Sequence, residues 1–373
     1  MSAALRVFVV LPDGSPAAAH RATVEILSHL PRHDVEPIVC FLGEGPLCGF
    51  CRDDLGVETV LVPVKGRRGA LQAVEPVLRG ARAGLVHSIS ARVHLLAGKA
   101  ARRVGLRAVW SQFETPDFGT IRALRAALRP ARAVLAASGA IERRQHRFNP
   151  RRVPVEKVAP GVTLYAEPGG GRREFARASL GVVPGEVAVG WMAGRAPAAE
   201  RDLALHAVAT LCHARPAARL IVIPCPAAPA NKGLKDSLRP LATSLGIAHR
   251  ISVSPPHEMH GASPVLAALD IALDVRADGD PVALAPIEAL AAGVPVVATD
   301  REPVREVVAH GRAGLLVPPG DAEAAAAALL TLADDPDLRA RYAAQAWESA
   351  LRDHDAAAVA ARVAAIYRRA VQA

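Results

Sequence analysis

The sequence predicts an α/β protein made of two doubly wound parallel-sheet domains. Short apolar runs alternate with Ala-, Leu- and Arg-rich segments of helical period, which is the pattern of parallel strands joined by crossover helices. The chain has 373 residues, of which 51% are hydrophobic and 22% are charged. It is therefore long enough for two globular cores and too apolar to be disordered.

The expected strands are β-rich apolar runs that fall into two sets. In the first half they are 6–11, 36–42, 58–64, 84–89, 107–113, 133–138 and 155–160. In the second half they are 187–194, 219–225, 250–256, 271–276, 294–299 and 314–319. Residues 165–186 lie between the sets and contain three consecutive glycines, so we expect the interdomain linker and the entry to the second domain there. From Asp321 onward the sequence predicts helices, with Asp321 as an N-cap.

Positive charge is concentrated in the first half of the chain. The net charge is +9, and residues 1–165 carry 24 Lys and Arg against 13 Asp and Glu, whereas the remainder carries 21 against 23. Only 3% of the residues are aromatic and no nucleic-acid motif is present, so we exclude nucleic acid as a partner. The spacing of Arg122, Arg125, Arg129 and Arg132 would line one helical face, but Pro130 interrupts it. Such a face suits anionic phospholipid or an ordinary solvated surface, and we favour the solvated surface.

Neither a membrane span nor a disulfide framework is expected. The longest uncharged stretches, such as 203–214 and 220–231, reach about a dozen residues, short of the ~18 that span a bilayer. Cys48 and Cys51 form a C-x-x-C without the second pair that a zinc site needs, so we favour structural cysteines. The first residues run directly into a strand without a leader-like apolar region. We expect a cytoplasmic protein.

The segment 278–321 carries the main functional signal. A strand is expected to end near Arg276, and a helix that carries Glu288 follows after a loop. In an open α/β sheet, ligands bind beyond the carboxyl ends of strands, where helix N-termini present N–H groups, so we expect an anion at 282–284. Asp280 and Glu288 are about two helical turns apart, so the first carboxylate can face a sugar while the second accepts hydrogen bonds from ribose hydroxyls. Two acids at this spacing are also common on solvated helices.

This segment resembles the E-x7-E signature of retaining GT-B glycosyltransferases (family 4-like, group 1). The matching residues are Asp280, Pro281, Val282, Ala283, Leu284, Glu288, Ala289, Ala291, Gly293, Pro295, Val296, Val297 and Ala298, then Glu306, Gly311 and Gly314. The resemblance implies two Rossmann-like domains facing across a cleft. It places an acceptor domain at 1–165, a nucleotide-sugar domain at 166–350 and a helix crossing back at 351–373. It also implies a metal-independent enzyme without a cofactor.

The resemblance assigns roles to individual residues of the second domain. The expected catalytic residues are Asp280, which contacts sugar hydroxyls, and Arg195 and Arg201, which neutralise the leaving diphosphate. The expected donor-binding residues are Gly194, Val282, Ala283, Leu284 and Glu288, the last of which holds the ribose.

In the first domain, the resemblance points to an acceptor and phosphate loop. The family's paired glycines fall at Ala17 and Ala18, or, if the loop is shifted, at Gly14 and Ser15, where Gly14 is free to adopt a left-handed conformation. His87 and Glu114 are further site candidates. His87 follows the pattern of a ligand-facing strand end and equally that of a structural histidine.

The sequence also departs from the family pattern. Arg201 replaces a Lys, and Asp280 replaces a Glu. Val282 and Ala283 stand where the signature has Phe and Gly, the loop glycines are displaced, and Phe113 replaces a histidine. These changes keep open a non-catalytic homologue that binds a nucleotide or a partner protein. A basic membrane-binding protein without chemistry is a third interpretation, and Asp278 with Asp280 leaves a minor metal alternative.

We therefore expect a retaining glycosyltransferase that uses a nucleotide-diphosphate sugar. Its acceptor is expected to be a glycan, a lipid-linked glycan or a small molecule. Its basic first domain is consistent with peripheral contact with an anionic membrane at the inner membrane face.

Overall fold

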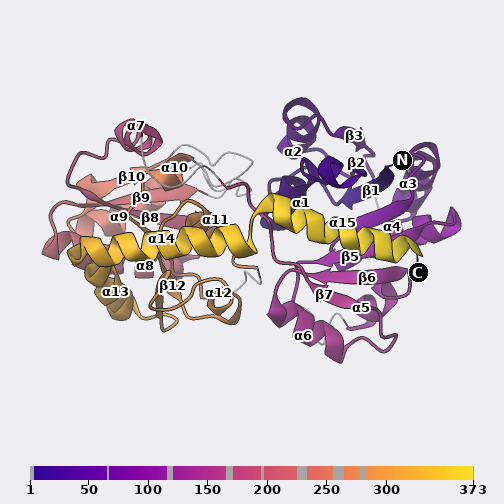
Figure 1. The fold of residues 1–373 in the computed structure, drawn as a ribbon. Helices are drawn as coiled ribbons and strands as arrows, with labels where there is room; N and C mark the ends of the chain where they lie inside the picture. Colours follow the sequence, from indigo (N-terminus) through magenta and orange to yellow (C-terminus); the bar gives the residue numbers. More distant parts are fainter. Residues whose placement is uncertain are drawn as a thin grey trace. The chain divides into compact units, whose positions relative to one another are not determined.

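The computed structural model describes residues 4–64, 67–115, 121–164, 171–194, 197–224, 233–254, 264–277 and 282–372. The chain divides into two compact units, each built on one sheet (Figure 1). Unit 1 comprises Met1–Gly161 with Asp355–Ala373, and unit 2 comprises Val162–His354. All strand pairs of both sheets are parallel among the described residues.

Unit 1 contains a seven-stranded sheet in the order β3-β2-β1-β4-β5-β6-β7. Its strands are β1 (Leu5–Leu11), β2 (Val35–Phe41), β3 (Glu58–Leu61), β4 (Leu85–Ile89), β5 (Arg107–Gln112), β6 (Ala131–Ala136) and β7 (Val155–Lys157). Its helices are α1 (Ala18–Leu27), α2 (Pro46–Gly49), α3 (Arg67–Gly80), α4 (Ala91–Arg103), α5 (Ile121–Ala127), α6 (Gly139–Arg147) and α15 (Ala356–Gln372), with shorter turns at Leu30–His33 and Phe50–Asp54.

Unit 2 contains a six-stranded sheet in the order β10-β9-β8-β11-β12-β13. Its strands are β8 (Val187–Gly194), β9 (Ala218–Pro224), β10 (Ile251–Val253), β11 (Ile271–Asp274), β12 (Val296–Thr299) and β13 (Gly314–Val317). Its helices are α7 (Gly171–Ser179), α8 (Ala198–Ala214), α9 (Leu234–Ser244), α10 (Pro264–Ala267), α11 (Leu284–Ala291), α12 (Glu302–Arg305), α13 (Ala322–Asp334) and α14 (Pro336–Asp353), with a short turn at Ala248–Arg250.

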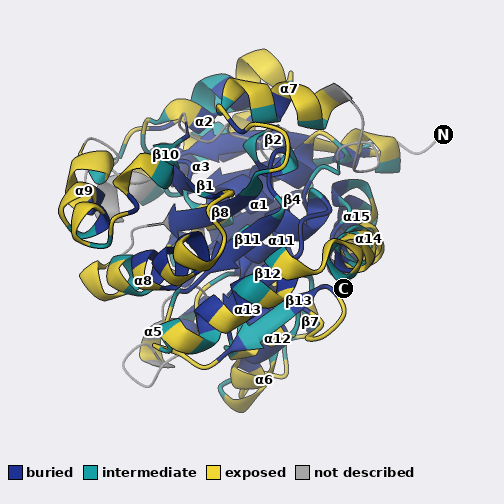
Figure 2. Cartoon of the chain, turned by 90° about the vertical axis from the view of Figure 1, so that its left-hand side faces the viewer, coloured by how far each residue is buried: buried dark blue, intermediate teal, exposed yellow. Residues whose placement is uncertain are grey.

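Every predicted strand segment contains a strand, and the reason lies in burial on both faces of each sheet. Central strands such as β1 and β12 are almost wholly buried, which explains their unbroken runs of apolar residues. Figure 2 shows buried strands and helices whose exposed residues face outward, as on α8 and α9. In unit 2 the core joins Trp191 and Leu273 of the sheet to Leu205 and Leu329 of two covering helices. The apolar periodicity therefore reports the packing of each helix on a sheet.

The C-terminal helices begin as the sequence predicts. The side chain of Asp321 accepts a hydrogen bond of 2.8 Å from the Ala324 amide at the start of α13, which confirms the predicted N-cap. Asp335 caps α14 in the same way. The last helix, α15, packs on α1 and on the turn at Leu30–His33 within unit 1.

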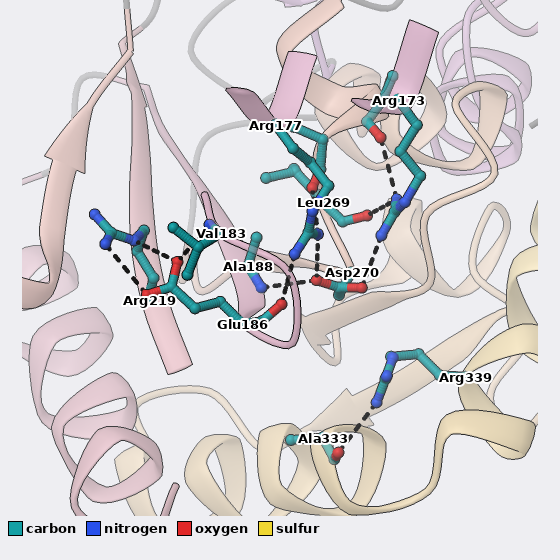
Figure 3. Close-up of polar contacts among 12 residues, drawn as sticks. Arg173, Arg177, Val183, Glu186, Ala188, Arg219, Leu269, Asp270, Ala333 and Arg339 are labelled. Carbon is teal, nitrogen blue, oxygen red and sulfur yellow. Dashed lines mark hydrogen bonds and ion pairs between the residues drawn. The ribbon is translucent and has the colours of Figure 1, made fainter. Parts of the chain in front are cut away.

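The glycine-rich segment 165–186 is more structured than a linker. Residues 171–179 form α7, and two of its arginines reach a single carboxylate at the start of β11 (Figure 3). Asp270 accepts hydrogen bonds from Arg173 at 2.8 Å, from Arg177 at 2.9 Å and from the Ala188 amide at 2.8 Å. These charged bonds fix α7 to unit 2, so this part of the segment belongs to the second domain that it was expected to enter.

Replacement of Asp270 by alanine tests this anchor. Asp270→Ala leaves two partly buried guanidinium groups without their shared acceptor, so we expect a loss of about 3 kcal/mol in the free energy of unfolding. Urea unfolding measures this loss. The matched control is Asp334→Ala, which removes an exposed pair with Arg215 and is expected to change stability by less than about 1 kcal/mol. Equal losses in the two variants would contradict the anchor.

Candidate functional site

Both sheets reverse their strand order beside the first strand of the unit. In unit 1, β1 lies between β2 and β4, and in unit 2, β8 lies between β9 and β11. At such a point the two adjoining connections leave in opposite directions, which opens a crevice at the carboxyl ends of the strands. The predicted site residues can therefore be examined at two defined places, one in each unit.

A buried carboxylate lies at the carboxyl end of β11 in unit 2. The side chain of Asp274 is fully buried and receives two hydrogen bonds of 2.7 Å from the guanidinium of Arg276. Arg301, which follows β12, lies 3.4 Å from the same carboxylate. Burial alone would raise the pKa of Asp274, but the two guanidinium groups hold it below its ordinary value. The strand end is thus a fixed cluster of charges.

Glu200 connects the loops on the two sides of this switch point. It lies in the first turn of α8, directly after β8, and its carboxylate accepts a hydrogen bond of 3.3 Å from the Ala277 amide after β11. Burial is the main influence on Glu200 and raises its pKa. Glu200, Arg276 and Arg301 were not among the predicted site residues. The only available signal was that each of these charged residues follows a predicted strand.

The helix that carries the signature begins with a left-handed residue. Ala283 has φ +54° and ψ +40°, and α11 starts at Leu284. Val282, Ala283 and Leu284 are all buried. Glu288 lies one turn further along α11 and its residue surface is only 4% exposed. The predicted order of strand, loop and helix around Glu288 is confirmed.

The remaining donor-site candidates divide into described and undescribed residues. Gly194 is the last residue of β8, and Arg201 is half-buried on the first turns of α8. Arg195 and Asp280, together with Asp278, lie outside the described residues. The structure therefore brings Gly194, Arg201 and the start of α11 to the same edge of one sheet.

The β1–α1 loop of unit 1 depends on a close backbone approach at Gly14. Its amide donates a 3.0 Å hydrogen bond to the Gly43 carbonyl, and a Cβ at Gly14 would lie 2.8 Å from backbone atoms of Gly45. Gly14 is not among the residues with positive φ, so it does not use the left-handed conformation that was open to it. Glycine is required here because a side chain would clash with the neighbouring backbone, and not because of the backbone dihedral angles.

Ser15 belongs to a small polar cluster that the sequence analysis missed. Its amide donates to Asp13 at 2.8 Å, and its carbonyl lies 2.9 Å from Nδ1 of the buried His20. Burial lowers the pKa of His20, although the Ser15 carbonyl and Asp13 act in the opposite direction. A neutral imidazole is thus held at the carboxyl end of β1. The only sequence signal was an Asp and a His placed on either side of this loop.

His87 occupies a structural position in unit 1. Its ring is 1% exposed, and its two nitrogens are hydrogen-bonded to Ser111 at 2.8 Å and to Tyr367 of α15 at 2.7 Å. Both nitrogens have protein partners, so the geometry favours the structural alternative for His87 and ties α15 to β4 and β5. Glu114 is exposed after β5, where its carbonyl accepts a hydrogen bond from Gln112.

The four spaced arginines do not share one helix. Arg122 and Arg125 lie on α5, which ends at Ala127, whereas Arg129 lies in the following turn and Arg132 on β6. All four are exposed, and the interruption expected at Pro130 is confirmed, because α5 ends before this residue and β6 begins directly after it.

The part of the chain that the structure describes contains no helix that is long and apolar enough to cross a membrane. No group of three or more His, Cys, Asp or Glu side chains there is placed to hold a metal ion. Cys48 and Cys51 are free thiols, which agrees with the structural interpretation.

Sequence comparisons identify similar proteins. A family model for group 1 glycosyl transferases matches residues 173–348. The D-inositol 3-phosphate glycosyltransferase of Streptomyces avermitilis is 30% identical over 367 residues, covering 91% of this chain and 74% of that protein. Its counterpart in Rhodococcus opacus is 36% identical over 207 residues, covering 54% of this chain. This match spans only 45% of the Rhodococcus protein's length.

Solved structures share the fold. The structure of Anabaena HepE in complex with UDP and glucose is similar with a TM-score of 0.83 at 20% identity, over 98% of this chain and 99% of that one. A glycosyltransferase from Rickettsia africae is similar with a TM-score of 0.84 at 14% identity, over 99% of both chains.

The left-handed alanine gives a testable prediction. Because an L side chain in this region costs about 1 kcal/mol relative to glycine, Ala283→Gly is expected to raise the free energy of unfolding by up to that amount. Urea unfolding measures the change. The control is Ala289→Gly inside α11, which is expected to lower stability by about 1 kcal/mol or more. A loss of stability in Ala283→Gly would contradict the assigned conformation.

The buried histidines predict a pH dependence of stability. Burial lowers the pKa of both His87 and His94 from an ordinary value of 6.5 to about 3. The unfolded chain therefore binds protons that the folded chain does not, so stability is full above pH 6.5 and falls toward pH 3. At pH 5 the loss is roughly 2 kcal/mol for each histidine.

Urea unfolding at pH 7 and pH 5.5 measures this dependence in a range where carboxylates contribute little. The variant His87→Gln is expected to show a smaller decrease between these two pH values than the parent chain. An unfolding free energy that is equal at both values would contradict the burial of neutral histidines.

Proposed function

Because this chain belongs to the group 1 glycosyltransferases, we propose that it transfers a sugar from a nucleotide diphosphate donor to a hydroxyl acceptor. The observation that carries the proposal is the meeting of three features at one switch point of unit 2. These are the strand end at Gly194, the first turn of α11 and the buried carboxylate of Glu288. A polar crevice of this kind suits a nucleotide.

The donor is proposed to lie across the carboxyl ends of β8 and β11. Arg195 and Arg201 neutralise the negative charge that develops on the leaving diphosphate, and the amides of Ala283 and Leu284 assist at the helix start. Glu288 accepts hydrogen bonds from the ribose hydroxyls, and Asp280 contacts the sugar. The guanidinium groups supply the charge that a divalent metal would otherwise provide, so the reaction is proposed to be metal-independent.

Transfer is proposed to retain the anomeric configuration. The leaving phosphate takes the proton of the acceptor hydroxyl, so no side-chain base is required on the donor side. UDP and UDP-glucose, which are bound in crystal structures of Anabaena HepE, are the first donors to test.

The acceptor is proposed to bind to unit 1 near the β1–α1 loop, where Gly14 and Ser15 supply backbone groups. The net positive charge of residues 1–165 suits an anionic acceptor. Because the similar proteins are named for D-inositol 3-phosphate, a phosphorylated cyclitol is the first small acceptor to test. Glycan and lipid-linked acceptors are the next candidates, and the latter would bring the basic unit to an anionic membrane.

A non-catalytic homologue is the second candidate function. The replacement of the family's Lys by Arg201, and of its first Glu by Asp280, favours this alternative. Thermal unfolding with a panel of nucleotide sugars, followed by an assay of donor hydrolysis, separates the two. Stabilisation with turnover supports the transferase, whereas stabilisation without turnover of any donor or acceptor supports the binding protein. No stabilisation by any nucleotide would contradict the transferase and a nucleotide-binding homologue alike, and it would favour a homologue that binds a partner protein.

Replacement of Glu288 by glutamine tests the donor site directly. Glu288→Gln keeps the shape of the side chain but removes the charge that strengthens hydrogen bonds to ribose, so we expect donor affinity to fall roughly 10- to 100-fold. Isothermal titration with the donor identified by the panel measures this loss. The control is Glu323→Gln in the first turn of α13, which is expected to leave affinity unchanged. Unchanged affinity in Glu288→Gln would contradict the assignment.

A further inference from the structure

A basic pocket lies on unit 1 at the amino end of a strand, whereas the β1–α1 loop lies at the carboxyl end of its strand. It has a volume of about 510 Å³ and is lined by His146, Asn149, Arg152, Val153, Pro154 and Val155. Val155 opens β7 and α6 ends at Arg147, so the pocket lies where a parallel strand begins. Because the proposed donor and acceptor groups lie at carboxyl ends of strands, this pocket, here termed the α6 pocket, is a separate place in the fold.

The loop that carries Arg152 is held by a reciprocal pair of hydrogen bonds. The side-chain amide of Asn149 donates to the Val153 carbonyl at 2.6 Å, and its oxygen accepts from the Val153 amide at 3.1 Å. Arg152 lies between them with φ +51°. The backbone beneath this guanidinium is therefore fixed, which reduces the conformational entropy that a ligand must overcome.

The helix α6 also carries a buried amide. Gln145 is fully buried, and neither its side-chain nitrogen nor its oxygen has a hydrogen-bond partner among the described residues. It is not one of the residues that line the α6 pocket, so the proposal below does not depend on it.

The charge around the α6 pocket is strongly positive. Residues 139–157 carry six basic side chains, Arg143, Arg144, Arg147, Arg151, Arg152 and Lys157, against Glu142 and Glu156. Glu156 is paired with Arg369 at 2.7 Å. No hydrogen bond or ion pair engages the guanidinium groups of Arg147, Arg151 and Arg152 within the described part of the chain. These groups are exposed and available to an anion.

We propose that the α6 pocket binds a phosphate-bearing anion through Arg152, with the backbone fixed by Asn149 and with His146 at its rim. The planar guanidinium donates two parallel N–H groups, a geometry that matches phosphate oxygens. The site accepts the phosphate of a free ester or of an anionic lipid headgroup, and it does so whether or not the chain transfers sugars.

The test uses the full chain at 0.15 M salt, where long-range attraction is screened. One arm titrates glycerol 1-phosphate by calorimetry, and the other measures co-sedimentation with phosphatidylglycerol vesicles against phosphatidylcholine vesicles. Arg152→Ala is expected to weaken binding about tenfold, and Arg152→Lys is expected to weaken it less because the charge remains. The matched control is Arg341→Ala, an exposed arginine of unit 2, which is expected to change nothing.

Each arm has a defined outcome. Arg152-dependent binding of glycerol 1-phosphate supports the site and identifies a free ester as a ligand. Arg152-dependent binding of the phosphatidylglycerol vesicles alone supports the site and identifies a lipid headgroup. Absence of binding in both arms at millimolar ligand, or binding that Arg152→Ala and Arg341→Ala weaken equally, would overturn the proposal. Thermal unfolding checks that the variants are folded.

Discussion

The reversal of strand order beside β8 is the constraint on which the proposed donor site depends. The strand order β10-β9-β8-β11-β12-β13 sends the connections of β8 and β11 away from each other. The space left between them cannot be filled by a crossover helix, so loops and helix starts surround it. Residues distant in sequence, such as Gly194 and Leu284, thereby reach the same edge of one sheet.

Buried charge then stabilises this edge. Asp274 is fully buried at the end of β11, and a lone carboxylate in such a place would be strongly unfavourable. Arg276 and Arg301 compensate for the negative charge of Asp274, because both guanidinium groups pair with this buried carboxylate. Glu200 bonds the loop after β11 to the helix after β8. The charged groups at this edge of the sheet are thus held by contacts within unit 2, and preorganised groups of this kind favour charged ligands.

The local pattern of apolar residues predicted the strands of both sheets and the position of α11. It could not predict which residues distant in sequence become partners in the folded chain. Strands buried on both faces are continuous apolar runs, so they are visible in the sequence. The helix α7 was missed because its stability comes from Asp270, some 90 residues away in sequence, and not from its own composition. The roles of His87 and His20 were equally hidden, since Tyr367 and the Ser15 carbonyl become their partners only in the folded chain.

The conformation of Ala283 bears on the choice between a transferase and an inert homologue. The signature of the resembled family has glycine at this position, and glycine adopts a left-handed conformation without steric cost. Here alanine adopts it, fully buried, at a cost of about 1 kcal/mol. A protein that needed only a stable helix could start α11 with a relaxed residue. A strained start persists when the surrounding structure requires that backbone path, and such strain is concentrated at ligand sites. The departure from glycine therefore changes the side chain while it keeps the backbone geometry that presents the α11 amides. This favours a functional donor site.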